Sequence, residues 1–306
     1  MSSDQYDEEL TRQPVPQKRP STAEIDSYLR TDPLEGLPSV VSVEGKKMKF
    51  GPCLKARRAA IEYCLSVGIA PDSLPRTYAK IDKAKGARVA ALYEGLESTP
   101  NDAETKAAFD AFVQETLAQW RVIKSTGLQV EYSPKWRGGH EPYASPRRLI
   151  LDVEHNNHLF VDVTRQAYGD QSFHADPSNP MLAEVPGELI SGEVPLVNDI
   201  LRIVHDYFGH TREGLGFRAE GEYNAWRSHR AMYSPLARRA MTVELLAQTC
   251  WVNFGPYAAD NVRANVDETH YATQKIGLLP DWVSEDWNVD AKEIGGTAGA
   301  EPGNRG

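Results

Sequence analysis

The sequence predicts an α+β fold that is predominantly helical, with a small antiparallel β-hairpin or sheet and a metal site between helices. Apolar side chains recur at three- and four-residue spacing through much of the chain before Gly127 and after Val197, which is typical of amphipathic helices. Between these regions lie short segments rich in β-branched and aromatic residues, which favour strands. Two histidines five residues apart, His205 and His210, fall in the second helical region.

The N-terminal part of the chain is predicted to be a tail followed by a helical region. Residues 1–22 are acidic and then rich in proline and basic residues, so we expect a disordered tail. The region 23–127 then contains helices and one strand pair around residues 40–50. Its predicted helices span residues 23–29, 53–67, 78–96 and 102–126.

After Gly127 the sequence pattern changes from one typical of helices to one typical of strands. Strands are expected at 130–132, 148–153 and 159–163. The turn-forming pair Asn156-Asn157 separates the last two strands, which predicts an antiparallel hairpin. Glu154, His155 and His158 lie at or beside its tip. A metal site there is an alternative, but a hairpin tip is exposed, so we interpret these residues as solvated.

The C-terminal part is predicted to be a metal-site domain, residues 128–294, followed by a second disordered tail. The tail, residues 295–306, is rich in glycine, alanine and proline. Three long helices are expected in the domain, at residues 197–208, 217–232 and 235–254. Asn198 or Asp199 is expected to cap the first of them.

Composition and charge exclude several classes of protein. Hydrophobic residues make up 41% of the 306-residue chain and charged residues 25%, which is ordinary for a globular protein. The net charge of −9 argues against nucleic acid as the main partner. Three scattered cysteines form no disulfide framework, and no apolar run reaches the roughly 18 residues of a membrane helix. We expect a cytoplasmic protein with a small-molecule substrate and no membrane partner, its oligomeric state being left open.

Residues 204–210, Val-His-Asp-Tyr-Phe-Gly-His, carry the clearest chemical signal. Histidine is the commonest protein metal ligand, and two of them this close need one more donor to form a site. Positions five apart in a regular helix face different ways, about 140° apart. We expect Gly209 to adopt a left-handed conformation that ends the helix and turns His210 towards His205. A pair of hydrogen-bonded core histidines is the alternative.

The third ligand is expected to be a carboxylate on a separate helix, and Glu244 is the first candidate. It follows Val243 on or beside the apolar stripe of the helix 235–254. A bound metal offsets the cost of burying a carboxylate. Glu222 is the competing candidate, and an ion pair of Glu244 with Arg238 or Arg239 is the structural alternative. Gln248, one turn beyond Glu244 on the same face, is expected to orient a metal-bound water or a histidine ligand.

Two histidines and one carboxylate form the facial triad of non-haem Fe(II) oxygenases. Zinc hydrolases use the same ligand types, so the ligand set alone leaves both metals open. Glu222 and His229 are seven residues apart and share one helix face. A two-metal cluster is therefore an alternative, although a structural ion network is the interpretation we favour for this pair.

The run His205-Asp206-Tyr207-Phe208-Gly209-His210 resembles the His-Asp/Glu-x-x-Gly-His motif of the pterin-dependent aromatic amino acid hydroxylases, bacterial phenylalanine hydroxylases in particular. The resemblance implies that His205, His210 and Glu244 bind catalytic iron, because a glutamate after Thr-Val is the third ligand in that family. It also implies a tetrahydropterin cofactor, with Asp206 lying near it. Here 34 residues separate His210 from Glu244, a shorter connection than in the family.

The resemblance covers about 40 residues. The segment Thr211-Arg-Glu-Gly replaces the Val-Pro segment that follows the second histidine in the family. No counterpart of the family's Arg/Pro-rich substrate and pterin segment precedes Asn198, so no substrate-gripping residue is carried over. Later segments around Asn224, Met232 and Gln274 are similar to uncharacterised proteins of bacteriophages and bacteria.

Three functions remain as hypotheses. The first is a non-haem Fe(II)-dependent oxygenase whose substrate is unknown and, on the resemblance, aromatic. The second is a zinc-dependent hydrolase in which zinc activates a water and Glu222 or Asp206 is the general base. The third is a non-enzymatic, phage-associated protein in which these residues are structural. The presence of a bound metal would separate the third hypothesis from the other two. The identity of that metal, iron or zinc, would separate the first two.

Overall fold

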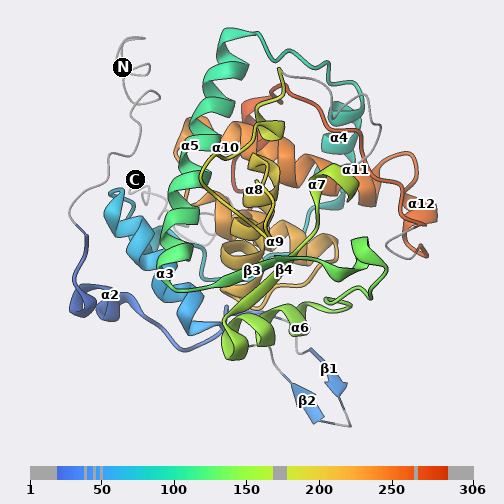
Figure 1. Cartoon of the computed structure of the whole chain (residues 1–306). Coiled ribbons are helices and arrows are strands. Elements are labelled where there is room, and N and C mark those ends of the chain that lie inside the picture. Colours follow the sequence, from blue (N-terminus) through green and yellow to red (C-terminus); the bar gives the residue numbers. More distant parts are fainter. Residues whose placement is uncertain are drawn as a thin grey trace, which may run out of the picture.

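The computed structural model describes residues 19–37, 40–43, 46–48, 51–167, 178–264 and 268–288, and most of them are helical (Figure 1). Most of the two predicted tails lies outside these residues. Of the first tail, residues 19–22 are described, and Thr22 already opens a helix. Within the described residues, no helix combines the length and apolar character needed to cross a membrane.

The helices predicted before Gly127 are confirmed, with small changes at their ends. They are α2 (Thr22–Tyr28), α3 (Leu54–Ser66), α4 (Lys83–Glu94) and α5 (Ala103–Ser125), with the short turn η1 (Pro71–Ser73) between α3 and α4. Three of them start at a residue whose side chain accepts a backbone N–H of the first turn: Ser21, Asp82 and Asp102. These caps replace hydrogen bonds that a helix start otherwise lacks, and Asp82 explains why α4 begins five residues later than predicted.

The antiparallel hairpin predicted at 148–163 is wrong. The paired strands there are β3 (Gln129–Tyr132) and β4 (His158–Val161), and they run parallel, with Gln129 opposite His158. The segment predicted as the hairpin's first strand is instead α6 (Pro146–Leu151), continued by the π turn η3 (Asp152–Asn156). Proline at the first helical position favours this start, and Leu149 and Val153, four residues apart, are both fully buried on one face.

The antiparallel pair that does exist lies near the N-terminus, where a strand pair was predicted around residues 40–50. It consists of β1 (Val40–Val43) and β2 (Lys46–Met48). The turn predicted at Asn156-Asn157 is also present, but it joins η3 to β4 rather than two strands. Asn157 adopts the left-handed conformation there, with φ of 52°.

The described part of the chain from Val197 to Phe254 is mostly helical, as predicted. The predicted helix 197–208 is α8 (Val197–His205) followed by the π turn η6 (Asp206–Thr211), and the predicted helix 217–232 is α9 (Ala219–Arg230). The predicted helix 235–254 is a run of α10 (Pro235–Thr242), the π turn η7 (Val243–Ala247) and α11 (Gln248–Phe254). The remaining short elements are η2 (Pro134–Arg137), α7 (Thr164–Ala167), η5 (Pro180–Leu182), α12 (Ala258–Asn261) and η9 (Asp281–Val283).

The cap of α8 lies slightly upstream of the predicted position. Leu196 is the N-cap residue, and the carboxylate of Asp199 accepts its backbone N–H at 2.8 Å. Asp199 is completely buried and also accepts hydrogen bonds from the Thr164 backbone and the Tyr132 hydroxyl. One carboxylate thus ties the start of α8 to β3 and to α7, which holds the helix that carries His205.

One hydrophobic core joins the two regions on either side of residue 127. Helix α5 packs along α10 and α8, and α4 packs along α11, so early and late helices lie side by side (Figure 1). At the C-terminal end of α8, the turn η6 packs against α9. Helices α8 and α9 with the turn η6 are therefore held in place by a common core.

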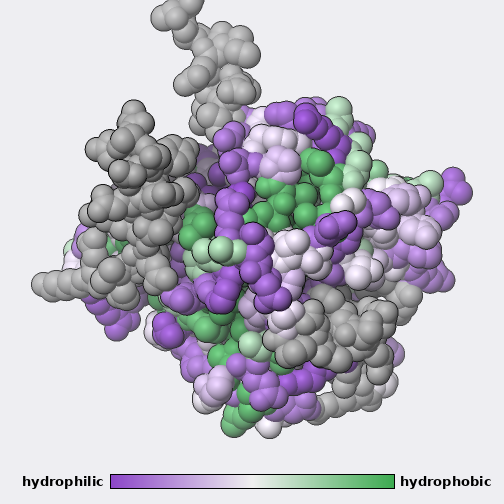
Figure 2. Space-filling view, turned by 90° about the horizontal axis from the view of Figure 1, so that it is seen from above, coloured by the Kyte–Doolittle hydropathy of each residue, from purple (hydrophilic) through white to green (hydrophobic). Residues whose placement is uncertain are grey.

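The face in Figure 2 is largely hydrophilic, with hydrophobic patches between the polar side chains.

Candidate metal centre

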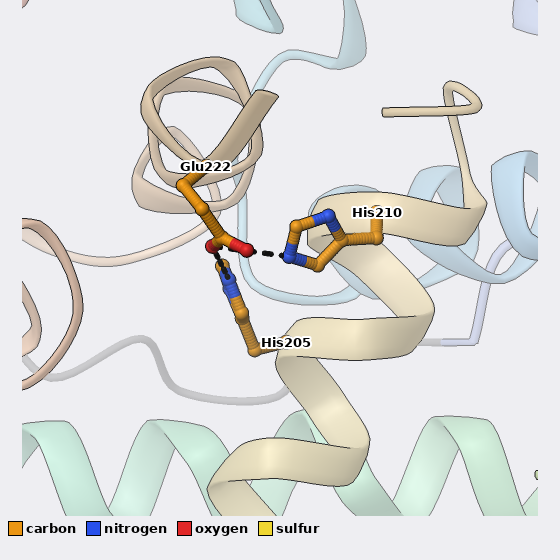
Figure 3. A group of neighbouring side chains, drawn as sticks. All are labelled: His205, His210 and Glu222. Atoms are coloured by element: carbon orange, nitrogen blue, oxygen red, sulfur yellow. Dashed lines mark ion pairs between the residues drawn. The ribbon is translucent and has the colours of Figure 1, made fainter. Parts of the chain in front are cut away.

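Three side chains from two helical segments converge in the core. His205 and His210 come from α8 and η6, and Glu222 comes from α9, which packs against η6 (Figure 3). One ligand atom of each lies within 4.8 Å of those of the other two. The Glu222 Oε2 atom lies 3.3 Å from His210 Nε2 and 3.8 Å from His205 Nε2. Among the described residues this is the only such group of potential metal ligands.

The π turn η6 explains how residues five apart face the same point. In a π turn the backbone N–H bonds to the carbonyl five residues earlier, so positions i and i+5 become neighbours on one side. The Arg212 N–H bonds to the Tyr207 carbonyl at 3.1 Å in this way, and the Leu215 N–H bonds to the His210 carbonyl at 2.9 Å. The two imidazole rings consequently lie 4.9 Å apart, edge to face.

Gly209 therefore acts differently from the prediction. It is not among the described residues with positive φ, so it does not end the helix in a left-handed conformation. Because it has no Cβ atom, Gly209 leaves space for the His205 ring and for the backbone of α9. A Cβ atom at this position would lie 2.8 Å from His205 Nδ1 and 3.3 Å from the Ala225 carbonyl oxygen. Only glycine lets the His205 ring and helix α9 approach the turn this closely.

Both histidines present the same nitrogen to Glu222, because the other nitrogen is already engaged. His210 Nδ1 lies 3.3 Å from the Leu215 carbonyl oxygen, which can only accept a hydrogen bond. His210 therefore donates from Nδ1, and its Nε2 is left with a lone pair when the ring is neutral. His205 Nδ1 lies 3.2 Å from Nδ1 of His229. Engagement of the second ring nitrogen is typical of metal-binding histidines.

The charges of the group are strongly coupled. Burial alone would raise the pKa of Glu222, but His210 and His205 outweigh it and hold that pKa far below the ordinary value. Burial opposes protonation of His210 as well, but Glu222 outweighs it, with help from Asp206, and raises its pKa to about 9. Burial lowers the pKa of His205. In the metal-free protein, a proton on His210 thus compensates the negative charge of the Glu222 carboxylate. A bound cation can compensate that charge in its place.

Access to the group is from the side of Glu222. The Glu222 side chain is 24% exposed, whereas those of His205 and His210 are 9% and 2% exposed. Asp206 is half-buried beside the group but is not one of its three members. Burial raises its pKa to about 6, although the positive charges of His210 and Arg202 oppose the rise. A carboxyl group that titrates near neutrality therefore lies next to the candidate ligands.

The structure does not bring Glu244 into the group, so Glu222 takes the place predicted first for Glu244. Glu244 lies on η7 and is buried, with its Oε2 3.3 Å from the side-chain nitrogen of Gln248. Its other oxygen, Oε1, has no hydrogen-bond partner among the described residues. Burial raises the pKa of Glu244 to about 8. The π turn η7 packs against α4 and α11 as well as α9, and Glu244 is not among the residues whose ligand atoms meet within 4.8 Å.

The other predicted residues lie as follows. Gln248 contacts Glu244, not the histidines. His229 shares a helix with Glu222 but contacts His205 through Nδ1, so it does not extend the group to a second metal position. Glu154 and His155 are exposed, as expected for solvated residues, whereas His158 is half-buried and lies 2.8 Å from Asp152.

Sequence reasoning missed Gln119. It lies on α5, is completely buried, and its side-chain oxygen lies 2.8 Å from His229 Nε2. The signal was a polar residue among the apolar residues that α5 buries, such as Phe112 and Trp120.

Comparison with protein-family models, with curated proteins and with solved structures finds no match to this chain.

Proposed function

We propose that His205, His210 and Glu222 bind a divalent metal ion and that the chain is a metal-dependent enzyme. The observation that carries the proposal is the convergence of two imidazole Nε2 atoms and one carboxylate within 4.8 Å. Both Nδ1 atoms are engaged elsewhere, so the Nε2 atoms are the ones available. Three protein ligands leave coordination positions for water and substrate, as in catalytic rather than structural metal sites.

A non-haem Fe(II) oxygenase is the first candidate. Two histidines and a carboxylate with open positions form the facial triad of these enzymes. The motif His-Asp-x-x-Gly-His, on which the resemblance to aromatic amino acid hydroxylases rests, supplies both imidazoles of the group. The proposal differs from the family in its carboxylate, which is Glu222 rather than Glu244. Bound Fe(II) would supply the activation of dioxygen, and a tetrahydropterin is the reductant that the resemblance implies.

The chain's own residues would hold the metal and move protons beside it. His205 and His210 bind through Nε2 as neutral imidazoles, which requires His210 to lose its proton. Glu222 remains ionised and neutralises part of the metal's charge. Asp206 lies beside the ligands with a pKa of about 6, so it can hold a proton or release one near neutral pH. The substrate is a small molecule, an aromatic one if the resemblance extends to it.

A zinc-dependent hydrolase is the second candidate, and Asp206 is the observation that favours it. Hydrolysis needs a general base next to a metal-bound water, with a pKa not far from the working pH. A half-buried carboxyl group with a pKa of about 6 beside three metal ligands fits that role. In this case Asp206 accepts the proton of the water, and Glu222 stays a ligand.

The deciding experiment is elemental analysis of the protein purified without added metal, followed by oxygen-consumption assays with Fe(II) and a tetrahydropterin. For the oxygenase we expect about one iron per chain and oxygen uptake that depends on it. His205→Ala should lose the metal and the activity while keeping the fold, since alanine is a good helix former. Asp206→Asn should retain the metal and slow turnover.

The outcomes separate the hypotheses. Zinc instead of iron, with no oxygen uptake, would favour the hydrolase. A protein that retains neither metal, and binds neither when titrated with Fe(II) or Zn²⁺, would overturn the proposal and leave the non-enzymatic, phage-associated alternative. Full metal occupancy in His205→Ala would contradict the ligand assignment itself.

A further inference from the structure

A line of buried polar side chains runs behind His205, on the side away from Glu222. The Gln119 side-chain oxygen lies 2.8 Å from His229 Nε2, and His229 Nδ1 lies 3.2 Å from His205 Nδ1. Gln119 and His229 are completely buried, and His205 is buried as well. The three residues come from α5, α9 and α8, so the line crosses the core from one helix to the next.

The donor and acceptor roles along this line follow from its first member. An amide oxygen can only accept, so His229 must carry its proton on Nε2. A neutral imidazole has one N–H. His229 is completely buried, and its hydrogen-bond partners among the described residues are His205 and Gln119, with no carboxylate to balance a positive charge, so the ring is neutral. His229 Nδ1 is then an acceptor. The contact between the two Nδ1 atoms requires a donor, and His205 Nδ1–H is the one available.

We infer that Gln119 and His229 form a hydrogen-bonded relay that fixes His205 in its Nδ1–H tautomer, with the Nε2 lone pair directed at the metal position. The two residues are positioning residues, and their role rests on the metal centre proposed above. His205 Nε2 lies 3.8 Å from Glu222 Oε2, on the side of the ring that faces the proposed metal position.

The Nδ1 atoms of the two histidines have different kinds of hydrogen-bond partner. The π turn itself supplies the partner of His210, the Leu215 carbonyl oxygen. His205 lies in α8, where the backbone carbonyls are used by the helix, so its partner must be a side chain. Burial of Gln119 and His229 costs free energy that packing alone does not explain, because apolar side chains would fill the same space more favourably. Orientation of a metal ligand accounts for that cost.

The test compares substitutions of Gln119 that keep or remove the acceptor. Gln119→Glu keeps an acceptor for His229 Nε2–H, whereas Gln119→Met is similar in size and has none. Gln119→Asn keeps the amide but is one methylene too short. Thr116→Val is the matched control, because Thr116 lies one turn earlier on α5, is equally buried and bonds to the Tyr233 hydroxyl at 2.9 Å. Zn²⁺ affinity is measured by competition with a chelator.

We expect Gln119→Met and Gln119→Asn to weaken Zn²⁺ binding by about 10- to 100-fold, the usual effect of removing a partner of a metal ligand. Gln119→Glu should bind Zn²⁺ at least as tightly as the parent protein. Thr116→Val should lower the melting temperature without changing the affinity. Nitrogen-15 NMR of the metal-free protein should show His205 with its proton on Nδ1 in the parent and in Gln119→Glu, and a loss of that preference in Gln119→Met.

The NMR measurement separates failure of the relay from failure of the metal centre. If the parent protein binds no Zn²⁺, the metal centre is wrong, and the tautomer of His205 still decides whether the relay exists. If the parent binds Zn²⁺ and Gln119→Met binds it equally well with the same tautomer, the relay is wrong and the metal centre stands. A His205 proton on Nε2 in the metal-free parent would also overturn the relay.

Discussion

Glu222 and Glu244 are both carboxylates on helices of the core, yet their surroundings give them opposite character. His210 and His205 hold the pKa of Glu222 far below its ordinary value despite burial, so this carboxylate is ionised. Among the described residues, Glu244 has only Gln248 within hydrogen-bond distance, and burial raises its pKa to about 8. A metal ligand must be ionised, and Glu222 is the carboxylate that is already ionised beside the two histidines in the metal-free protein.

This contrast leads to a paired prediction. Glu222→Gln should lose metal binding, because an uncharged amide replaces the only carboxylate of the group. Glu244→Gln should retain the metal. It should also melt at a higher temperature than the parent at pH 8. The unfolded parent ionises Glu244 above a pKa of 4.5, whereas the folded parent holds the proton up to a pKa of about 8, so the parent loses stability across that range and the variant does not.

Metal content and melting curves of both variants, measured beside the parent protein, check the prediction. Loss of metal from Glu244→Gln with retention by Glu222→Gln would restore the ligand set that the hydroxylase resemblance implies.

At the scale of secondary structure, the π turns are the elements that shape the centre. An uninterrupted α-helix would place His205 and His210 about 140° apart around its axis. The single π turn η6 instead brings both side chains to the same side. The turn is possible because Gly209 allows the ring of His205 and the backbone of α9 to pack against it. The site therefore depends on the conformation of six residues, Asp206–Thr211, as much as on the ligands themselves.

Gly209→Ala should accordingly disturb the centre without unfolding the protein. The added methyl group would lie 2.8 Å from His205 Nδ1, so the ring must move and its contact with His229 must lengthen. We expect metal affinity to fall about tenfold or more. Gly216→Ala is the control, since its nearest new contact is an ordinary 3.9 Å to Pro146.

Titration of both variants with Zn²⁺ provides the measurement, with circular dichroism to verify the helical content. Equal affinities in the two variants would show that the close approach at Gly209 is unrelated to metal binding.

At the scale of the whole molecule, the proposed metal centre would couple metal binding to the stability of the core. Its ligands come from α8, η6 and α9, and these pack with α5 and α10 into one hydrophobic core. A metal ion that binds only the folded chain stabilises it by about 2.7 kcal/mol at a hundredfold excess over Kd. Local unfolding of η6 or α9 should therefore become rarer when metal is bound.

The protonation of His210 predicts how this stability depends on pH. Glu222 and Asp206 outweigh the effect of burial and raise its folded pKa from 6.5 to about 9. A group with a raised pKa stabilises the fold fully below its unfolded pKa, and that contribution is lost as the pH rises through the folded pKa. The melting temperature of the metal-free protein should therefore fall between pH 6.5 and 9, relative to His210→Gln.

Metal binding should show the opposite trend, because Zn²⁺ competes with the proton on His210 and its affinity should rise over the same range. Thermal melts with a chelator or with Zn²⁺, at several pH values, test both statements. A metal affinity that does not change between pH 6.5 and 9 would contradict the assignment of the proton to His210.

The sequence by itself determined the elements whose signals are local. The spacing of apolar residues located α3, α5, α8 and α9, and the motif at 205–210 identified two histidines that do converge. Both signals depend on residues that are neighbours in the chain. Residues 148–153 show the limit of this reasoning, because the same apolar run suits a strand or a buried helix face, and only packing of Leu149 and Val153 decides between them.

Only the tertiary structure decided the third member of the group, the conformation of Gly209 and the role of Gln119. Glu222 and Glu244 both lie on helices with apolar faces, and nothing local to either tells which helix packs against η6. Gln119 is 110 residues from His229 in the sequence, yet the two side chains are hydrogen-bonded. Such contacts depend on how helices pack across the core, because side-chain chemistry is set by neighbours in space rather than in sequence.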